Sequence, residues 1–575
     1  MPSSEKEQSL NLLQGHKRFT SVSSSTSSSS SSSTISSNVV PASPSRMLFD
    51  EKDYGYSQHE EFDELDEVSL TGRFAWLRCY SWDEAFRLSR VGIDIFVAAI
   101  LPSFFFKNRA PKAKLHPTAY LDGLRGVAAF FVFIHHFILD WFPSLSSGYS
   151  SSPTDVWFLQ WRFVRIVYSG RGMVALFFVI SGYVLSYKCL RQIRRHELPG
   201  VLETLTSSVF RRGIRLFLPI TVSTFISLLI IRKDWYIPDP QYANLLPERT
   251  ETLREQFWDW SHHLYLTINP FQLIDGKDLY GNPYDGHLWT IPIEFRGSIV
   301  VFLTLLGLAK TKQVVRLSLM IVLTLYTLYI THWDLFLFLS GMLLCEVDFL
   351  RSAGIVEGHI LPQTRLPPTT NRFHDLTARF KTPLTHLWTL PTFALGIHLL
   401  AYPDNQAALT PGYRSMTVYL TPSQYEPFTD PAMTQRFWLS IGAVLTCLAL
   451  SFSAPLSLPS ISCFRHHSSA LTATSSTVPS LLQRPFTTPF AQYLGKISFA
   501  FYLVHGPVLY TLGMQILYKA LQPGQEGRFT YWFLWAVLVN ASICFWAADV
   551  FWRVVDARSV WFAGWVKRKC WVGEK

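Results

Sequence analysis

One segment of the chain combines a membrane-length apolar run with ionisable side chains. It is DGLRGVAAFFVFIHHFILDW, from Asp122 to Trp141, with Arg125 near its start and the pair His135 and His136 deep inside. Hydrocarbon solvates such groups poorly, so an ionisable side chain within a span indicates a functional site. Arg125 and His136 are eleven positions apart, so on a helix they share one face, roughly 16 Å apart along the axis. A cation at one end of the span and an imidazole inside the bilayer would suit a substrate-binding site between them.

Three further ionisable residues fall in other apolar runs at similar depth. HLWTIPIEF places His287 at the end of one run and Glu294 two turns inside it, and FYLVHGPVL places His505 near the middle of another. An imidazole suits removal of a hydroxyl proton because its pKa lies near neutral pH. If these runs are neighbours, they would supply a general base, an orienting carboxylate and a second proton-handling group.

Each of these residues also has a structural interpretation. Arg125 could be an anchor whose guanidinium reaches the membrane interface. His136 could bond a neighbouring helix, and for His135 that role is favoured. His505 could contact a carbonyl freed by Pro507. An unpaired carboxylate inside a span is costly, so Glu294 is harder to explain structurally.

The composition indicates which elements position these residues. Of 575 residues, 49% are hydrophobic and only 16% are charged, and long apolar runs recur from Leu124 to Trp552. This is typical of a polytopic helical membrane protein, and we expect an all-α transmembrane bundle. The net charge of +10 does not indicate a nucleic-acid partner, because the basic residues cluster beside apolar runs.

Ten apolar runs approach the length of a membrane span. They lie near 124–141, 172–189, 214–231, 287–309, 317–331, 333–348, 384–402, 437–453, 497–518 and 531–552. Residues 117–555 would therefore form the transmembrane domain. Residues 1–85, with a serine tract and an acidic patch, predict a disordered cytoplasmic tail. Residues 86–116 predict an interfacial or re-entrant helix, and 556–575 a second cytoplasmic tail.

Charge in the loops predicts the orientation in the membrane. With ten spans and both termini cytoplasmic, most basic loops fall on the cytoplasmic side, as the positive-inside rule requires. The loop 142–171 is an exception, because it places Arg162, Arg165 and Arg171 outside. The long loops 232–286 and 403–436 would also lie outside and shape substrate choice. Seven cysteines show no metal-ligand spacing, and we expect no metal site.

Five motifs, in this order, resemble the acyltransferase-3 family of integral membrane O-acyltransferases. They are DGLRGVAAFFVFIHH, GMVALFFVISGYVLS, FRRGIRLFLP, HLWTIPIEF and LGKISFAFYLVHGPV, spread from Asp122 to Val508. The family's arginine–ten residues–histidine pattern falls on Arg125 and His136, and its tryptophan–glutamate motif on Trp289 and Glu294. The Ser-Gly-aromatic turn matches 181–183, and Tyr-Leu-x-His-x-Pro matches 502–507. The sequence departs from the pattern in two places: Phe295-Arg296-Gly297 follows the glutamate where the family usually has Gln-Phe-Tyr or similar, and Ala175 replaces a frequent acidic residue.

The resemblance implies transfer of an acyl group, often acetyl, from acyl-CoA to a hydroxyl of a carbohydrate, lipid or small metabolite. Acyl-CoA would then be a co-substrate, with acetyl-CoA as the favoured donor, and we expect no bound cofactor. Arg125 with Arg211, Arg212 and Arg215 would form a cationic mouth for the CoA phosphates. His136 would deprotonate the acceptor hydroxyl, and Glu294 or His505 would orient or polarise the reactants.

Two other functions fit an ionisable cluster in a membrane. A transporter or flippase would use the buried histidines and glutamate as a proton relay, although no inverted repeat is evident. A catalytically silent membrane scaffold is the third possibility. Consumption of an acyl donor distinguishes the enzyme from both.

Overall fold

A computed structural model describes the chain over 101–103, 115–139, 141–237, 247–269, 280–360, 372–426, 429–454, 480–520, 524 and 526–572. Within these residues the protein is all helical, and the only bridges of β type are two isolated pairs. The predicted all-α class is therefore confirmed. The tail 1–85 and most of the segment 86–116 lie outside the described residues.

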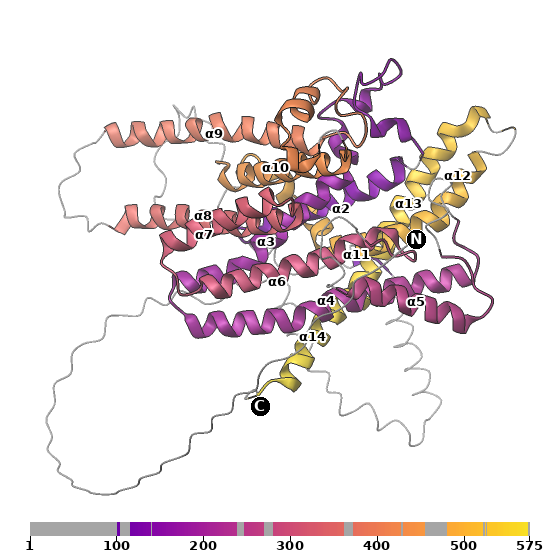
Figure 1. Ribbon diagram of the computed structural model, residues 1–575, viewed down its shortest axis with the longest axis horizontal. Coiled ribbons are helices and arrows are strands. Elements are labelled where there is room, and N and C mark those ends of the chain that lie inside the picture. Colours follow the sequence, from indigo (N-terminus) through magenta and orange to yellow (C-terminus); the bar gives the residue numbers. More distant parts are fainter. Residues whose placement is uncertain are drawn as a thin grey trace, which may run out of the picture. The chain divides into compact units, whose positions relative to one another are not determined.

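A helix occupies each of the ten predicted apolar runs (Figure 1). These helices are α2 (Ala119–Leu139), α3 (Gly170–Arg194), α4 (Leu198–Arg232), α6 (Thr290–Leu308), α7 (Gln313–Tyr329), α8 (Trp333–Ile360), α9 (Arg372–Leu400), α10 (Pro431–Phe452), α11 (Pro489–Val508) and α13 (Phe529–Phe551). Among the described residues, seven helical stretches are long and apolar enough to cross a membrane, and α7 is apolar but shorter.

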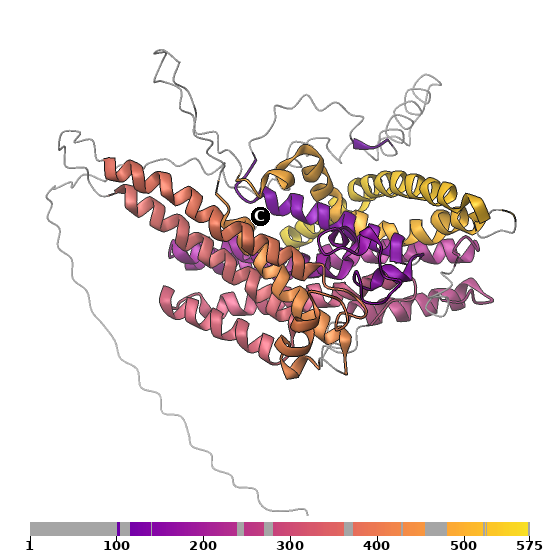
Figure 2. The ribbon, with the colours of Figure 1, turned by 90° about the horizontal axis from the view of Figure 1, so that it is seen from above.

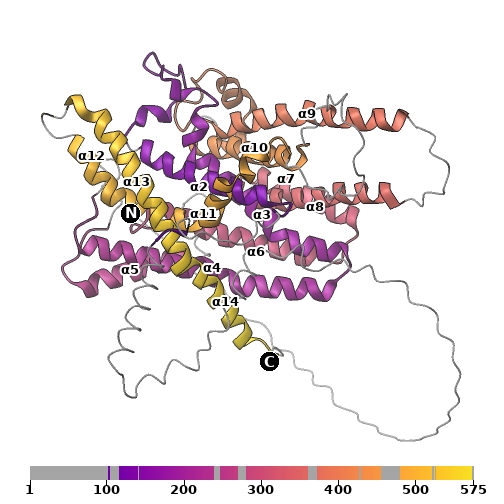
Figure 3. The same cartoon turned by 180° about the vertical axis from the view of Figure 1, so that it is seen from behind.

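Three helices extend or interrupt the predicted pattern. After α11 the chain continues through the π-helical turn Leu509–Gly513 into α12 (Met514–Ala520). After α13 it continues through Trp552–Asp556 into α14 (Ala557–Cys570), and Figure 3 shows this path as one long diagonal. The segment expected to be a tail thus begins in a helix. Helix α5 (Leu253–Ile268) lies within the predicted loop 232–286 and starts at a capping box formed by Thr252 and Glu255.

Helices distant in sequence form the main contacts of the bundle. The most extensive are α3 with α8, α2 with α11, and α9 with α10. Figures 1 and 2 show α8 and α9 on one flank and α12 and α13 on the other. Small residues permit the α3–α8 contact, since a Cβ on Gly182 would lie 2.0 Å from the carbonyl oxygen of Phe338. Ser181-Gly182 is therefore a close-packing motif of the kind that joins membrane helices.

Buried ion pairs mark one end of the bundle. Arg194 of α3 and Arg316 of α7 both pair with Glu346 of α8, at 3.0 and 2.7 Å, and the Glu346 side chain is fully buried. We call this the Glu346 end. The opposite end contains the first residues of α3 and α10 and the loop after α9, where Asp404 lies, and we call it the Asp404 end.

The glycine contact between α3 and α8 gives a stability test. Replacing Gly182 by Ala should lower the free energy of unfolding by about 1–3 kcal/mol, because the new methyl group meets backbone rather than a flexible side chain. Gly307→Ala in α6 is the matched control, since a Cβ added there would meet nothing within 4 Å. Thermal unfolding in detergent measures both. An equal melting temperature for the two variants would contradict the assigned role of Gly182.

Candidate functional site

Three histidines from three separate elements meet inside the bundle. His136 lies in α2, His287 in the 3-10 turn Gly286–Trp289 before α6, and His505 in α11. The ring centroids are 4.0 Å apart for His136 and His287, 4.4 Å for His287 and His505, and 5.5 Å for His136 and His505. We call these residues the histidine group. The structure thus brings together two predicted site residues, His136 and His505.

Two of the three rings are held by hydrogen bonds that also define their tautomers. His287 Nδ1 lies 2.9 Å from Asp285 Oδ1, and His505 Nδ1 lies 2.6 Å from the carbonyl oxygen of Tyr502. A carbonyl oxygen only accepts, so Nδ1 of His505 carries the proton and Nε2 keeps its lone pair. A carboxylate also accepts, so the neutral His287 ring has the same arrangement. Asp285 supplies the carboxylate that contacts the histidine group, and it lies only two residues before His287 in the sequence.

The local fold brings these rings close together. A Cβ on Gly506 would lie 2.7 Å from His287 Nδ1, so only glycine beside His505 admits the His287 ring. Tyr502, one turn earlier in α11, donates its hydroxyl to the His287 carbonyl and accepts a 2.7 Å bond from Thr290 Oγ1. This contact fastens the 3-10 turn before α6 to α11.

Exposure differs within the histidine group. His287 and His505 are buried, with 5% and 1% of their surfaces exposed, whereas His136 is half-buried. Among the described residues, His505 Nε2 has no hydrogen-bond partner, and His136 forms none through its side chain. His136 is therefore the ring that an incoming molecule can reach, and His505 offers an unused acceptor behind it.

Glu294 lies outside the contacts of the histidine group. Its Oε1 accepts a 2.5 Å ion pair from Arg212 Nη2 and a 2.9 Å bond from Ser181 Oγ. Arg212 also donates from Nε to Ser298 Oγ at 2.9 Å. Glu294 follows His287 by seven residues, a rise of roughly 10 Å toward the Glu346 end. Glu294 is therefore paired with Arg212, one of the arginines predicted to bind phosphate. Its contacts link α6 to α3 and α4.

The other predicted phosphate-binding arginines lie in the first turns of α2 and in the middle of α4. Arg125 pairs with Asp122 at 3.5 Å and donates to the Gly495 carbonyl at 3.1 Å. Arg215 and Arg125 both lie within electrostatic range of Asp556. Arg211 donates to the carbonyl of Ser207, one turn earlier in α4. Arg125 and Arg215 thus converge on one carboxylate, while Arg212 is joined to Glu294.

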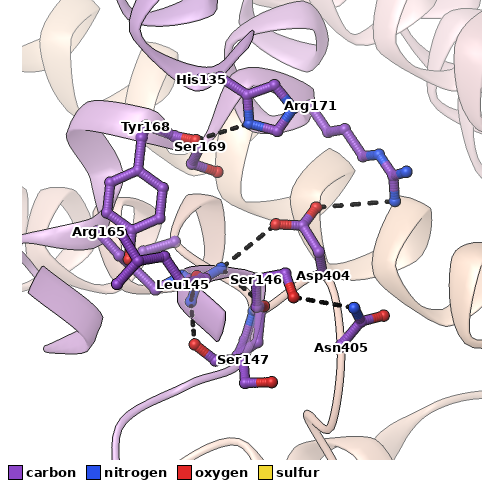
Figure 4. Close-up of polar contacts among 12 residues, drawn as sticks. His135, Leu145, Ser146, Ser147, Arg165, Tyr168, Ser169, Arg171, Asp404 and Asn405 are labelled. Atoms are coloured by element: carbon purple, nitrogen blue, oxygen red, sulfur yellow. Dashed lines mark hydrogen bonds and ion pairs between the residues drawn. The ribbon is translucent and has the colours of Figure 1, made fainter. Parts of the chain in front are cut away.

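A second polar network holds the loops at the Asp404 end (Figure 4). Asp404 pairs with Arg165 at 3.4 Å and with Arg171 at 3.7 Å. Arg165, only 1% exposed, also donates to the backbone carbonyls of Leu145, Ser146 and Ser147. His135 Nδ1 donates to the Tyr168 carbonyl at 2.8 Å, which gives this histidine a structural partner.

The Asp404 network explains the unusual charge of the loop 142–171. Burial alone would raise the pKa of the Asp404 carboxyl, but Arg171, His135 and Arg165 together hold it below its usual range. Arg165 and Arg171 are thus partners of a largely buried carboxylate, and Asp404 offsets part of their charge. Sequence reasoning could not pair them, because Asp404 follows Arg165 by more than two hundred residues.

The Asp404 pairs give a pH-dependent stability test. Asp404→Asn should lower the free energy of unfolding at neutral pH by about 1–3 kcal/mol, since two arginines lose a charged partner. A lowered pKa means that this contribution is present above the ordinary value of 3.8 and disappears as pH falls through the lower folded-state value. The difference between wild type and variant should therefore close below that pH. Asn405→Ala, an exposed neighbour, is the control, and a pH-independent difference would argue against the ion pairs.

The histidine group also has the composition of a metal-binding site. One ring nitrogen from each residue lies within 4.8 Å of the others. Histidine ligands usually donate their second nitrogen to a carboxylate or a carbonyl, as His287 and His505 do. These lone pairs could hold Zn²⁺, or instead accept protons during catalysis.

Added Zn²⁺ should bind at the histidine group and compete with proton transfer. At a hundredfold excess over its Kd, the ion should stabilise the protein by about 2.7 kcal/mol and inhibit it reversibly. His136→Ala, His287→Ala or His505→Ala should remove the rise in melting temperature, and the exposed His262→Ala should retain it. Chelation should restore activity. If chelation instead abolished activity and Zn²⁺ restored it, the group would be a catalytic metal centre.

The helical bundle and its internal histidine group define a multi-pass membrane protein with groups suited to proton transfer. Comparison with known proteins supplies the reaction class. Residues 118–549 match the acyltransferase-3 family model, described as an acyltransferase domain. The chain belongs to this family and is an acyltransferase that transfers groups other than amino-acyl groups, so the predicted resemblance is confirmed.

Three relatives bear names of the same class. The chain is 30% identical to the O-acetyltransferase PaAT-1 of Phomopsis amygdali, over 81% of this chain and 88% of the relative. It is 25% identical to acyltransferase clz18 of Cochliobolus lunatus and 24% identical to acyltransferase R4 of Phoma sp. (strain ATCC 20986 / MF5453), each over 69% of this chain and 83% of the relative. No solved structure matches the chain.

Proposed function

We propose that this acyltransferase moves an acyl group, first of all acetyl, from acyl-CoA to a hydroxyl group of a carbohydrate, lipid or small metabolite. The observation that carries the proposal is the half-buried His136 ring against His287 and His505 inside the bundle. The relative named as an O-acetyltransferase supports hydroxyl as acceptor and acetyl as the group transferred.

His136 is the general base of the proposed reaction. It removes the proton of the acceptor hydroxyl, and the oxygen attacks the thioester carbonyl carbon to form a C–O bond. Collapse of the tetrahedral intermediate breaks the C–S bond, and the CoA thiolate takes the proton from the His136 imidazolium. Asp285 holds the adjacent His287 ring in place. His505 Nε2 can accept a hydrogen bond from an N–H or O–H group of either substrate and so orient it.

The donor enters from the Glu346 end in this proposal, and that end is cytoplasmic. Arg125, Arg211 and Arg215 are candidates for the CoA phosphates, because guanidinium groups bind phosphate bidentately. Arg212 would act through Glu294, with which it pairs. Arg125 lies about 16 Å from His136 along α2, a span that an extended thiol arm can bridge. In this proposal both termini also lie on the cytoplasmic side of the membrane.

Loss of the proposed base should abolish transfer without unfolding the protein. His136→Ala should reduce turnover of labelled acetyl-CoA with a metabolite extract by about 10²–10⁴-fold, the usual contribution of a general base. The melting temperature should change little, because the side chain forms no hydrogen bond with the described residues. His262→Ala, an exposed histidine on α5, is the control. Unchanged turnover in His136→Ala would refute the assignment.

A further inference from the structure

A cavity of about 280 Å³ opens at the Asp404 end, between α3, α8 and α10. Its walls combine guanidinium groups with indole rings, and the residues used below are Arg171, Trp289, Trp333, Gln435 and Arg436. Binding pockets for whole drug-sized ligands usually measure about 300–1,000 Å³. The cavity is therefore large enough for one portion of a substrate rather than for all of acyl-CoA.

Arg436 contributes a positive charge that the described part of the chain does not pair. Its guanidinium lies 5.5 Å from the centre of the Trp333 ring, and its Nη1 contacts the sulfur of Met433 at 3.3 Å. The two nearby carboxylates are engaged elsewhere. Asp334 pairs with Arg296 at 2.5 Å, and Asp430 accepts from the first backbone amides of α10. Arg436 can therefore give the Nε and Nη2 edge of its guanidinium to a ligand.

The second guanidinium stands beside the first on the cavity wall. Arg171 donates to Gln435 Oε1 at 2.7 Å, and Gln435 is the residue before Arg436. The Arg171 side chain is 53% exposed, so this wall is reached from outside the bundle. Its pairing with Asp404 is long, at 3.7 Å, and leaves room for a further acceptor.

One wall of the cavity comes from the turn that carries His287. Trp289 lies two residues after His287 in the same 3-10 turn and forms part of the cavity wall. Gly170, the residue before Arg171, packs against the ring of His135, the neighbour of His136, since a Cβ added to Gly170 would lie 2.6 Å from that ring. A molecule held in the cavity can therefore present another of its groups to the half-buried His136 ring.

Resting on the proposed function, we propose that this cavity binds a carboxylate of the acceptor, so that the enzyme acylates hydroxy acids. Arg436, with Arg171, binds the carboxylate, and the indoles of Trp289 and Trp333 pack against the adjoining carbon skeleton. A guanidinium matches a carboxylate bidentately, and an indole face suits an apolar ring system. The acceptor hydroxyl then reaches His136, while the donor phosphates stay at the other end of the bundle.

Chemical masking of carboxylates tests the proposal. Full-length enzyme in membranes is incubated with labelled acetyl-CoA and a metabolite extract of the source organism. Half of the extract is first treated with trimethylsilyldiazomethane, which converts carboxylic acids to methyl esters. We expect the labelled product from the untreated half to bind an anion exchanger, and the treated half to give at least tenfold less product. Equal labelling of both halves would overturn the proposal while leaving acyl transfer intact. No transfer in either half would overturn the proposed function itself.

Variants of Arg436 locate the carboxylate on the protein. With the acidic fraction as acceptor, Arg436→Gln should raise the acceptor KM at least tenfold and leave the acetyl-CoA KM unchanged. Arg436→Lys, which keeps the charge but loses the bidentate geometry, should be less affected. Arg414→Gln, an exposed arginine in the loop before α10, is the matched control. Melting temperatures confirm folding. A rise in the acetyl-CoA KM instead would show that the cavity holds the donor, and an unchanged acceptor KM would also overturn the proposal.

Discussion

Ionisable side chains inside an apolar bundle must be paired within the protein, and the rest of this structure depends on that constraint. A charge buried there without a partner is costly. Glu346 meets two arginines, Asp334 meets Arg296, and Glu294 meets Arg212. Each pair joins different helices, and together they link α3, α4, α6, α7 and α8. The ion pairs thus help to select which helices are neighbours.

The histidine group satisfies the same constraint differently. A neutral imidazole can be buried without a counter-ion, provided that its N–H has an acceptor. Asp285 and the Tyr502 carbonyl are those acceptors, and they use only one nitrogen of each ring. The second nitrogens keep their lone pairs inside the bundle. An ion pair would have committed its charge to structure, whereas these rings retain groups that can accept a proton.

The two ends of the bundle differ in the charges that they present. At the Glu346 end, arginines of α2 and α4 surround carboxylates, with Arg125 and Arg215 near Asp556. At the Asp404 end, the Asp404 network holds the loops, and Arg171 and Arg436 line a cavity whose wall includes Trp289, two residues after His287. A reaction between two substrates can use this separation, because each can enter from its own end. The half-buried His136 then lies between them.

Apolar length and composition determined the helices and the fold class, because a span must be long and apolar wherever it packs. The family followed from five motifs in a fixed order, which composition alone does not specify. The apolar pattern did not predict α5, whose half-polar sequence resembles a loop. It also predicted too late a start for α4, because the first turns of that helix are polar. The sequence also indicated His136 and His505, since a histidine in an apolar run is conspicuous. Only the tertiary structure decided their partners. It paired Glu294 with Arg212 and brought the rings of His136, His287 and His505 together, because helix neighbours are chosen by packing between segments far apart in the sequence.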